Sequence, residues 1–231
     1  MAHVRMNGVE RRQSIISAAR PLFAKHGFRG TSVKAIAKAA GVSEGLLYKY
    51  FSSKDSLYTE ILGYAIDLYD TFFTELEKLE AGAETLVKYV HLSVRLILFE
   101  VPGFKEAQHW HERLMFRSLI GDIRYAKAHF KNVQEHLAVR IPECVEAAVR
   151  AGNIVQVEIA PDNHYWFLHH LAMALNLCFL SKEPAFIYGG SKEDLARQVL
   201  LFSLRGIGMT PEAIDRFCRQ EELEAFFHRL H

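Results

Sequence analysis

Several residues within the first sixty carry groups that bind phosphates and base edges. Lysine ammonium and tyrosine hydroxyl groups donate hydrogen bonds to phosphate oxygens or purine acceptors, and a tyrosine ring also packs against a thymine methyl. A glycine among them allows the backbone to approach a ligand closely. The candidates are Thr31, Ser43, Gly45, Leu46, Tyr48, Lys49, Tyr50 and Lys54. Their chemistry suits a nucleic acid, provided that the surrounding elements hold them on one surface.

The elements that must position these residues are helices. Apolar residues recur at helical spacing almost everywhere, and no segment alternates with the period of a strand, so the sequence predicts an all-α fold. A first helix, with Pro21 in its interior, is expected to end at Gly27. A second begins at Thr31 or Ser32 as its N-cap and ends before Gly41, which occupies a left-handed C-cap position.

Ser43 then caps a short third helix, and Ser52 or Ser53 begins a fourth that runs to about Leu79. The run from Ser52 to Asp55 fits a capping box. Further helices are expected at about 83–100, 104–119, 122–151, 162–180, 192–206 and 211–229, with Pro142 kinking or splitting the third of these.

The second and third helices form a helix-turn-helix pattern, in which the third helix would enter the major groove of DNA. With Leu47 and Phe51 turned into the small core, Tyr48 and Lys49 lie on the face that meets the groove. The alternative is an ordinary helical corner in which Tyr48 and Tyr50 only pack at the rim.

Charge is distributed unevenly along the chain. Residues 1–60 contain 10 Lys and Arg against 4 Asp and Glu, a net charge of +6, whereas the whole chain has a net charge of +1. The remainder is therefore at −5. A basic N-terminal module on a mildly acidic body favours a polyanionic partner.

The N-terminal residues resemble the DNA-binding domain of the TetR family of bacterial transcriptional regulators over about residues 10–60. The matching residues are Ile15, Ile16, Ala18, Ala19, Leu22, Phe23, Gly27, Phe28, Gly30, Thr31, Ser32, Val33, Ile36, Ala37, Ala40, Gly41, Val42, Ser43, Gly45, Leu47, Tyr48, Tyr50, Phe51, Ser53, Lys54, Asp55 and Leu57. Leu46 departs from the pattern, because this position of the reading helix is often polar, and Pro21 is a local departure.

The resemblance implies a homodimer that binds double-stranded operator DNA of palindromic sequence. It assigns residues 1–53 to the DNA-binding domain and residues 54–231 to a helical domain that binds an effector and dimerises. It places the family's DNA contacts on the eight candidates named above. Repression released by the effector is the family's usual mode of action.

The dimer interface is expected in the helices near 162–180 and 192–206. The first is apolar on nearly every face, from Trp166 to Phe179, and therefore needs a partner besides its own core. Full burial within a monomer is the alternative. Five aromatic residues are candidates for the lining of an effector pocket, with ordinary core packing as the alternative: Phe99, Phe104, Trp110, Phe116 and Tyr125. Such a lining implies a small, largely apolar or aromatic effector.

Other function classes find little support. His109 with His111, and His169 with His170, lack the i, i+3 or i+4 spacing of ligands on one helix face, so neither a metal nor another cofactor is expected. No motif of a hydrolase elbow, P-loop or dinucleotide site is present, so we expect no enzyme. An interaction protein that has lost DNA binding is a third possibility, against which the intact candidate residues argue.

The composition predicts a cytoplasmic protein. Three widely spaced cysteines support no disulfide framework, and the N-terminus lacks the apolar segment of a signal peptide. The most apolar stretch, Trp166 to Leu180, is too short to span a membrane and contains histidines.

Overall fold

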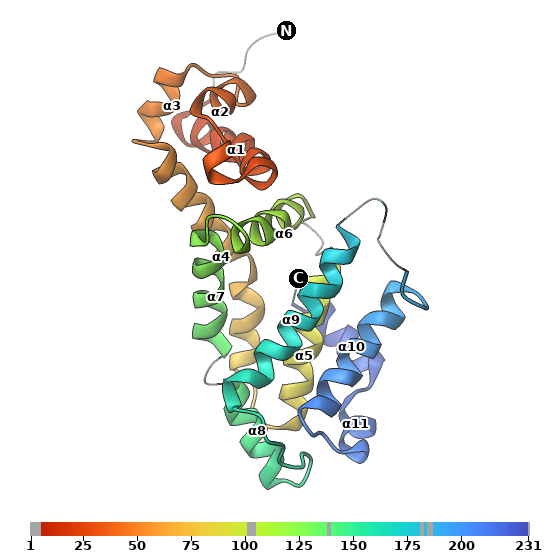
Figure 1. Ribbon diagram of the computed structural model, residues 1–231. Coiled ribbons are helices and arrows are strands. Elements are labelled where there is room, and N and C mark those ends of the chain that lie inside the picture. Colours follow the sequence, from red (N-terminus) through yellow and green to blue (C-terminus); the bar gives the residue numbers. More distant parts are fainter. Residues whose placement is uncertain (1–5, 101–104, 138–139, 181–182, 184–186, 231) are drawn as a thin grey trace. The chain divides into compact units, whose positions relative to one another are not determined.

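The computed structural model describes residues 6–100, 105–137, 140–180, 183 and 187–230, excluding the side chains of residues 64–71, 105–109, 136 and 162. Within these residues every regular element is an α-helix, and one isolated antiparallel bridge joins Ile154 to Met209 (Figure 1). The all-α prediction is confirmed. No described helix has the length and hydropathy that crossing a bilayer requires.

The described helices follow one another as α1 (Gly8–Gly30), α2 (Val33–Ala39), α3 (Glu44–Tyr50), α4 (Lys54–Glu77), α5 (Ala83–Leu98), α6 (Lys105–Leu119), α7 (Arg124–Leu137), α8 (Arg140–Arg150), α9 (Pro161–Phe179), α10 (Lys192–Gly206), α11 (Pro211–Phe217) and α12 (Gln220–His228). They are distributed over two compact units. The first comprises residues 1–69 and 104–132, and the second comprises residues 70–103 and 133–231.

The first unit has a core of aliphatic and aromatic side chains. Ile15 and Phe23 of α1, Ile36 of α2 and Leu47 of α3 are fully buried, as their helical spacing predicts. Tyr58 of α4 joins them, with its ring centroid 5.0 Å from that of Phe23. These contacts hold α2 and α3 against α1. Helices as short as these would not be stable alone in water.

In the same unit, α6 packs along α1. Trp110 and Leu114 of α6 are buried, and the guanidinium carbon of Arg20 on α1 lies 5.0 Å from the ring centroid of Trp110. Pro21 lies within α1, but the helix is interrupted at Gly27, whose φ of 69° is left-handed. The break at Gly27 is where the sequence predicts the end of the helix.

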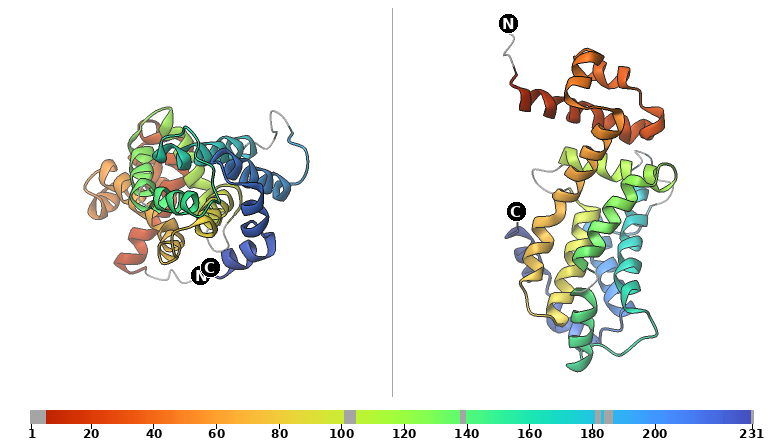
Figure 2. Two further views of the ribbon diagram at one scale, coloured as in Figure 1. Left: turned by 90° about the horizontal axis from the view of Figure 1, so that it is seen from below. Right: turned by 90° about the vertical axis from the view of Figure 1, so that its left-hand side faces the viewer.

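The second unit is built around α5, which is buried along nearly its whole length and contacts α8, α9, α10, α11 and α12. Figure 2 shows α5, in yellow, running beside α9 and α10. A capping box begins α10, since the Ser191 hydroxyl accepts from the Asp194 amide and the Asp194 carboxylate accepts from the Ser191 amide.

Two predicted helices are each divided in the structure. The segment predicted at 122–151 forms α7 and α8, and Pro142 lies in the first turn of α8, where its missing amide hydrogen costs no helical bond. The segment predicted at 211–229 forms α11 and α12, because Cys218 has ψ of 50° and leaves the helical region. The single helix predicted over 211–229 was therefore wrong.

Candidate nucleic-acid interface

The α2 to α3 segment is held by two side-chain caps and one glycine. The Ser32 hydroxyl accepts from the Ala35 amide at 3.1 Å, and the Ser43 hydroxyl accepts from the Leu46 amide at 3.1 Å. Gly41 follows α2 with φ of 64°, a conformation that side chains with a Cβ rarely adopt. The sequence predicted both the cap at Ser43 and the left-handed glycine, and left the cap of α2 open between Thr31 and Ser32.

One side of α3 is buried and the other is exposed. Leu47 and Phe51 are 0% and 2% exposed, as predicted, whereas the Tyr48 side chain is 49% exposed. Lys49 and Gly45 are also exposed. A Cβ added to Gly45 would meet no atom within 4 Å, so the protein itself does not require a glycine at this position. The exposed side therefore presents a phenol, an ammonium group and an uncovered stretch of backbone.

Three other candidates frame this surface. Ser43 is exposed beside the N-terminus of α3, while Leu46 and Tyr50 are half-buried. The amide groups at the start of a helix carry partial positive charge and bind anions, so a cap residue such as Ser43 lies next to a favourable phosphate position. The half-buried Leu46 offers an apolar contact.

Thr31 differs from the expectation for a phosphate-binding side chain. It is 2% exposed, and its hydroxyl lies 2.8 Å from the Gly27 carbonyl oxygen and 3.1 Å from that of Leu22. The hydroxyl thus closes the end of α1, and the exposed Ser32 takes the capping position.

Lys54 begins α4 and spans back to α1. Its ammonium group donates to the carbonyl oxygens of Phe28 at 2.8 Å and Thr31 at 2.9 Å, and lies 4.2 Å from the centroid of the Phe28 ring. Two of its three donors are used in this way. The capping box at this helix start is formed by Ser53 and Ser56, which exchange bonds of 3.1 and 3.0 Å.

The predicted capping pair of Ser52 and Asp55 was therefore wrong. Asp55 instead forms an ion pair with Arg124, a residue 69 positions away at the start of α7. Arg124 was missed because no local pattern in the sequence joins it to α4. Lys34 and Lys38 of α2, both exposed, were also missed, although the net charge of residues 1–60 pointed to additional basic groups.

The residues predicted to line an effector pocket are placed in different parts of the structure. Trp110 and Tyr125 are buried and Phe116 is half-buried, all three in the first unit. Phe99 follows α5 in the second unit, where the Arg95 guanidinium lies 4.0 Å from its ring centroid. Phe104 lies outside the described residues.

The surroundings of Trp110 and Tyr125 are more polar than predicted. Nδ1 of His111 lies 2.5 Å from the Tyr125 hydroxyl, and the rings of His111 and His129 have centroids 5.0 Å apart. Burial lowers the pKa of His129 to about 4, so this imidazole is neutral at pH 7. Across the described part of the chain, no group of three or more potential ligands has a geometry suited to a metal.

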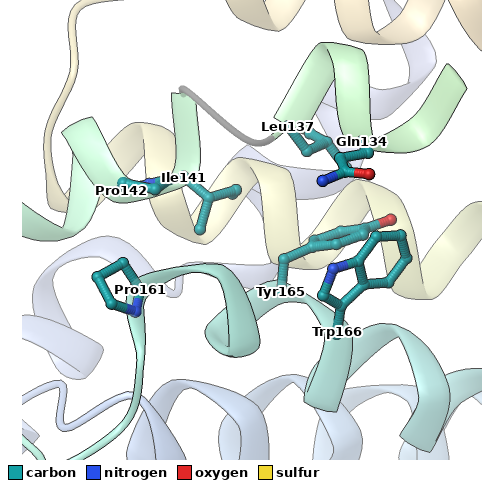
Figure 3. Close-up of a pocket in the computed structure, with 7 residues that line it drawn as sticks. All are labelled: Gln134, Leu137, Ile141, Pro142, Pro161, Tyr165 and Trp166. Carbon is teal, nitrogen blue, oxygen red and sulfur yellow. The ribbon is translucent and has the colours of Figure 1, made fainter. Parts of the chain in front are cut away.

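A small cavity lies in the second unit between the end of α7, α8 and the start of α9 (Figure 3). The side chains of Gln134, Tyr165 and Trp166 face one another across it, with Ile141 and Pro161 at its other end. Its volume of about 20 Å³ is enough for about one water molecule. An effector would have to widen this cavity in order to enter.

Comparison with known proteins identifies relatives of the N-terminal region. Residues 15–61 match the family model described as bacterial regulatory proteins, tetR family. The HTH-type transcriptional repressor KstR2 of Rhodococcus jostii (strain RHA1) is 44% identical over 63 residues, which are 27% of this chain and 31% of that protein. The HTH-type transcriptional regulator HbdR of Aromatoleum sp. (strain CIB) is 44% identical over 61 residues, 26% of this chain and 27% of HbdR. The chain thus matches less than a third of the length of either relative.

Solved structures are also similar to this chain over most of its length. The crystal structure of AibR in complex with isovaleryl coenzyme A and operator DNA superposes with a TM-score of 0.61 at 16% identity, and covers 84% of this chain and 97% of AibR. At this identity the similarity is one of fold.

Proposed function

Because the chain belongs to the TetR family of bacterial regulatory proteins, we propose that it is a transcriptional regulator, without enzymatic activity, that represses by binding operator DNA. The observation that carries this proposal is the exposed side of α3, which presents Tyr48, Lys49 and Gly45 while Leu47 and Phe51 anchor the helix. In the major groove, Lys49 donates to guanine acceptors and Tyr48 packs against a thymine methyl or donates to phosphate.

Around this helix, phosphate contacts orient the protein on the duplex. Ser43 and the amides of the first turn of α3 bind one phosphate, and Tyr50 contributes a hydroxyl. Lys54 keeps its bonds to two carbonyl oxygens and uses its third donor for a phosphate. The contribution of Thr31 comes from its backbone amide, because its hydroxyl is engaged with α1. Leu46 makes an apolar contact.

We further propose that residues 1–53 act as the DNA-binding domain and that residues 54–231 mediate dimerisation and effector binding. The dimer face is formed by α9 and α10, where Phe167 and Phe202 are 59% and 70% exposed beside a groove of about 210 Å³. Large exposed aromatic side chains on adjacent helices are typical of an interface, and a twofold dimer would read a palindromic operator.

The effector is proposed to be a small, largely apolar or aromatic molecule that binds in the helical domain and releases the DNA. AibR, which has a similar fold, was solved with both isovaleryl coenzyme A and operator DNA, and this supports a fold that binds a small molecule and DNA in one complex. Of the five predicted lining residues, Trp110, Phe116 and Tyr125 belong to one compact unit and are retained as candidates for one pocket, with His111 beside Tyr125 as a polar anchor. Phe99 belongs to the second unit and is a candidate only for a separate site there, and Phe104 lies outside the described residues.

The DNA-binding proposal is tested by selecting random duplexes for binding at moderate salt. We expect enrichment of a palindrome whose half-sites lie about one helical turn, or a multiple of it, apart. Lys49→Ala should then lose about 5- to 150-fold in operator affinity and relax the preference at one position, whereas the exposed Lys127 of α7 provides the matched Lys→Ala control. If no sequence is enriched, the proposal fails and an interaction protein becomes the better hypothesis.

The dimer is tested separately by sedimentation. Phe202→Glu should convert the dimer to a monomer at micromolar concentration, because it places a charge in the centre of the proposed face. Ile120→Glu is the control, since Ile120 is 87% exposed but lies outside α9 and α10. A wild-type monomer, or dimers that survive Phe202→Glu unchanged, would contradict the proposed face.

A further inference from the structure

Arg124, the first residue of α7, is held by two carboxylates and two rings. Its Nε and Nη2 donate to the Asp122 carboxylate at 2.9 and 2.6 Å, and Nη1 donates to the Asp55 carboxylate. The guanidinium carbon lies 4.3 Å from the ring centroid of Phe28 and 5.3 Å from that of Tyr58. A planar guanidinium is suited to donating in its plane while stacking on rings above it.

The α7 side of this arrangement is fixed by its own turn. The Ser118 hydroxyl donates to the Asp122 carbonyl oxygen at 2.5 Å, and the same hydroxyl accepts from the Ala126 amide at 3.0 Å. Hydrogen bonds from Arg124 lower the pKa of Asp122, so this carboxylate is ionised at neutral pH. The turn between α6 and α7 thus presents Arg124 in one geometry.

The other side leads directly to the candidate DNA-binding elements. Asp55 lies in the first turn of α4, next to Lys54. The centroid of the Phe28 ring lies 4.2 Å from the ammonium of Lys54 and 4.3 Å from the guanidinium carbon of Arg124, so both cations contact the same ring. Lys54 in turn binds the carbonyl oxygen of Thr31, two residues before α2 begins. A continuous set of contacts therefore runs from the start of α7 to the start of α2.

A simple surface ion pair would contribute too little to hold these helices in a fixed arrangement. The side chains of Arg124 and Asp55 are 40% and 58% exposed, and such pairs alone contribute little. The arrangement differs because the same guanidinium also binds Asp122 and stacks on two rings, one of which is the fully packed Tyr58. Loss of Arg124 would remove contacts at three places at once: Phe28 near the end of α1, Asp55 at the start of α4, and Asp122 just before α7.

We propose that Arg124 is a positioning residue for DNA recognition, which fixes α2 and α3 relative to the α6 to α7 turn without itself contacting DNA. The proposal rests on the DNA-binding function proposed above. It agrees with the division of the chain, in which residues 104–132 belong to the same compact unit as α1, α2 and α3. A displacement of the start of α7 would then be transmitted through Asp55 and Phe28 to the reading helix.

The test compares Arg124→Gln, Arg124→Lys and wild type, with Lys127→Gln as the control for loss of one positive charge from an exposed position of the same helix. We expect Arg124→Gln to reduce affinity for the selected operator at least fivefold, with less than twofold change in affinity for unrelated duplex DNA. Arg124→Lys should recover part of the loss, because it keeps the charge but not the planar fork. In the Asp55→Asn/Arg124→Gln double variant, the loss should not exceed that of Arg124→Gln alone, since both changes remove the same contact.

Hydrogen exchange provides a readout that needs no DNA. Amides of residues 32–51 should exchange faster in Arg124→Gln than in wild type or Lys127→Gln, although circular dichroism shows the same helix content. Unchanged exchange and unchanged operator affinity in Arg124→Gln would overturn the proposal, as would an equal loss in Lys127→Gln. If wild type selects no operator, the proposed function fails, while the exchange comparison still decides whether Arg124 positions these helices.

Discussion

Gly45 allows stability and DNA binding to be separated by adding a single methyl group. It lies in the first turn of α3, is exposed, and has a φ outside the left-handed region. A Cβ built at this position meets no atom within 4 Å, so alanine fits the free protein without strain. If α3 lies in the major groove with this backbone against the DNA, the same methyl group occupies space that the duplex needs.

The two effects have opposite signs. Replacing a strain-free helical glycine by alanine stabilises a protein by about 0.5–1 kcal/mol, because the unfolded chain loses conformational freedom. At about 2–4 °C per kcal/mol for a protein of this size, the melting temperature should rise by about 1–4 °C. Operator affinity should fall by about 1–3 kcal/mol, the range for one lost base contact, which is roughly 5- to 150-fold in Kd.

Gly63→Ala is the matched control for this prediction. Gly63 lies inside α4, is exposed, and a Cβ there also meets no atom within 4 Å. It should raise the melting temperature similarly, while Kd for the operator stays within twofold of wild type. Both variants are compared by thermal unfolding and by fluorescence anisotropy with labelled operator at one salt concentration. A Gly45→Ala protein that binds operator as tightly as Gly63→Ala would refute the close approach of this backbone to DNA.

Three further predictions concern charge, pH and backbone strain. Lys54→Ala should reduce the slope of log K against log salt by about one for every duplex, as measured by anisotropy titrations, with an added loss for the operator because Lys54 also bonds to the Thr31 carbonyl oxygen; an unchanged slope would contradict a phosphate contact. Burial lowers the pKa of both His91 and His129 to about 4, so the folded state resists protonation and stability is lost as pH falls from about 6.5 towards 4. At pH 5.5 each histidine lowers the free energy of unfolding by about 1.4 kcal/mol relative to its value well above pH 6.5. In urea unfolding, His129→Gln should therefore reduce the loss of free energy of unfolding between pH 7.5 and 5.5. An unaltered pH dependence would show that burial does not lower the pKa of His129. Gly208→Ala should lower the melting temperature by several degrees, because φ is 93° and the new Cβ would lie 2.3 Å from the Val155 carbonyl oxygen; unchanged melting would contradict this geometry.

The features that the sequence predicted well depend on a few neighbouring residues. The cap at Ser43 and the left-handed Gly41 both follow from the local competition of side chains and backbone for hydrogen bonds. The burial of Leu47 follows from helical spacing in the same way. Such signals are contained within one or two helical turns, so they can be recognised in the sequence without knowledge of the tertiary structure.

The features that were missed depend on contacts between distant segments. Asp55 looked like the N3 residue of a capping box, but Ser56 takes that role and Asp55 pairs with Arg124. Thr31 is an exception, because its hydroxyl donates to the Gly27 carbonyl oxygen only four residues earlier. The polar surroundings of Trp110 arise because Arg20 of α1 lies over its ring, and no pattern within α6 reveals this neighbour.

Arg124 also explains how an acidic residue is tolerated near a surface proposed to bind phosphates. Asp55 lies in the first turn of α4, where the helix dipole favours a negative charge, yet an unpaired carboxylate there would repel DNA. Because its carboxylate accepts from Nη1 of Arg124, which also binds Asp122, its charge is partly compensated within the same unit. Lys54 beside it can then direct its remaining donor to a phosphate. In the proposed function, the first turn of α4 thus combines helix stabilisation with a phosphate contact, and Arg124 of α7 supplies the cation that pairs with Asp55.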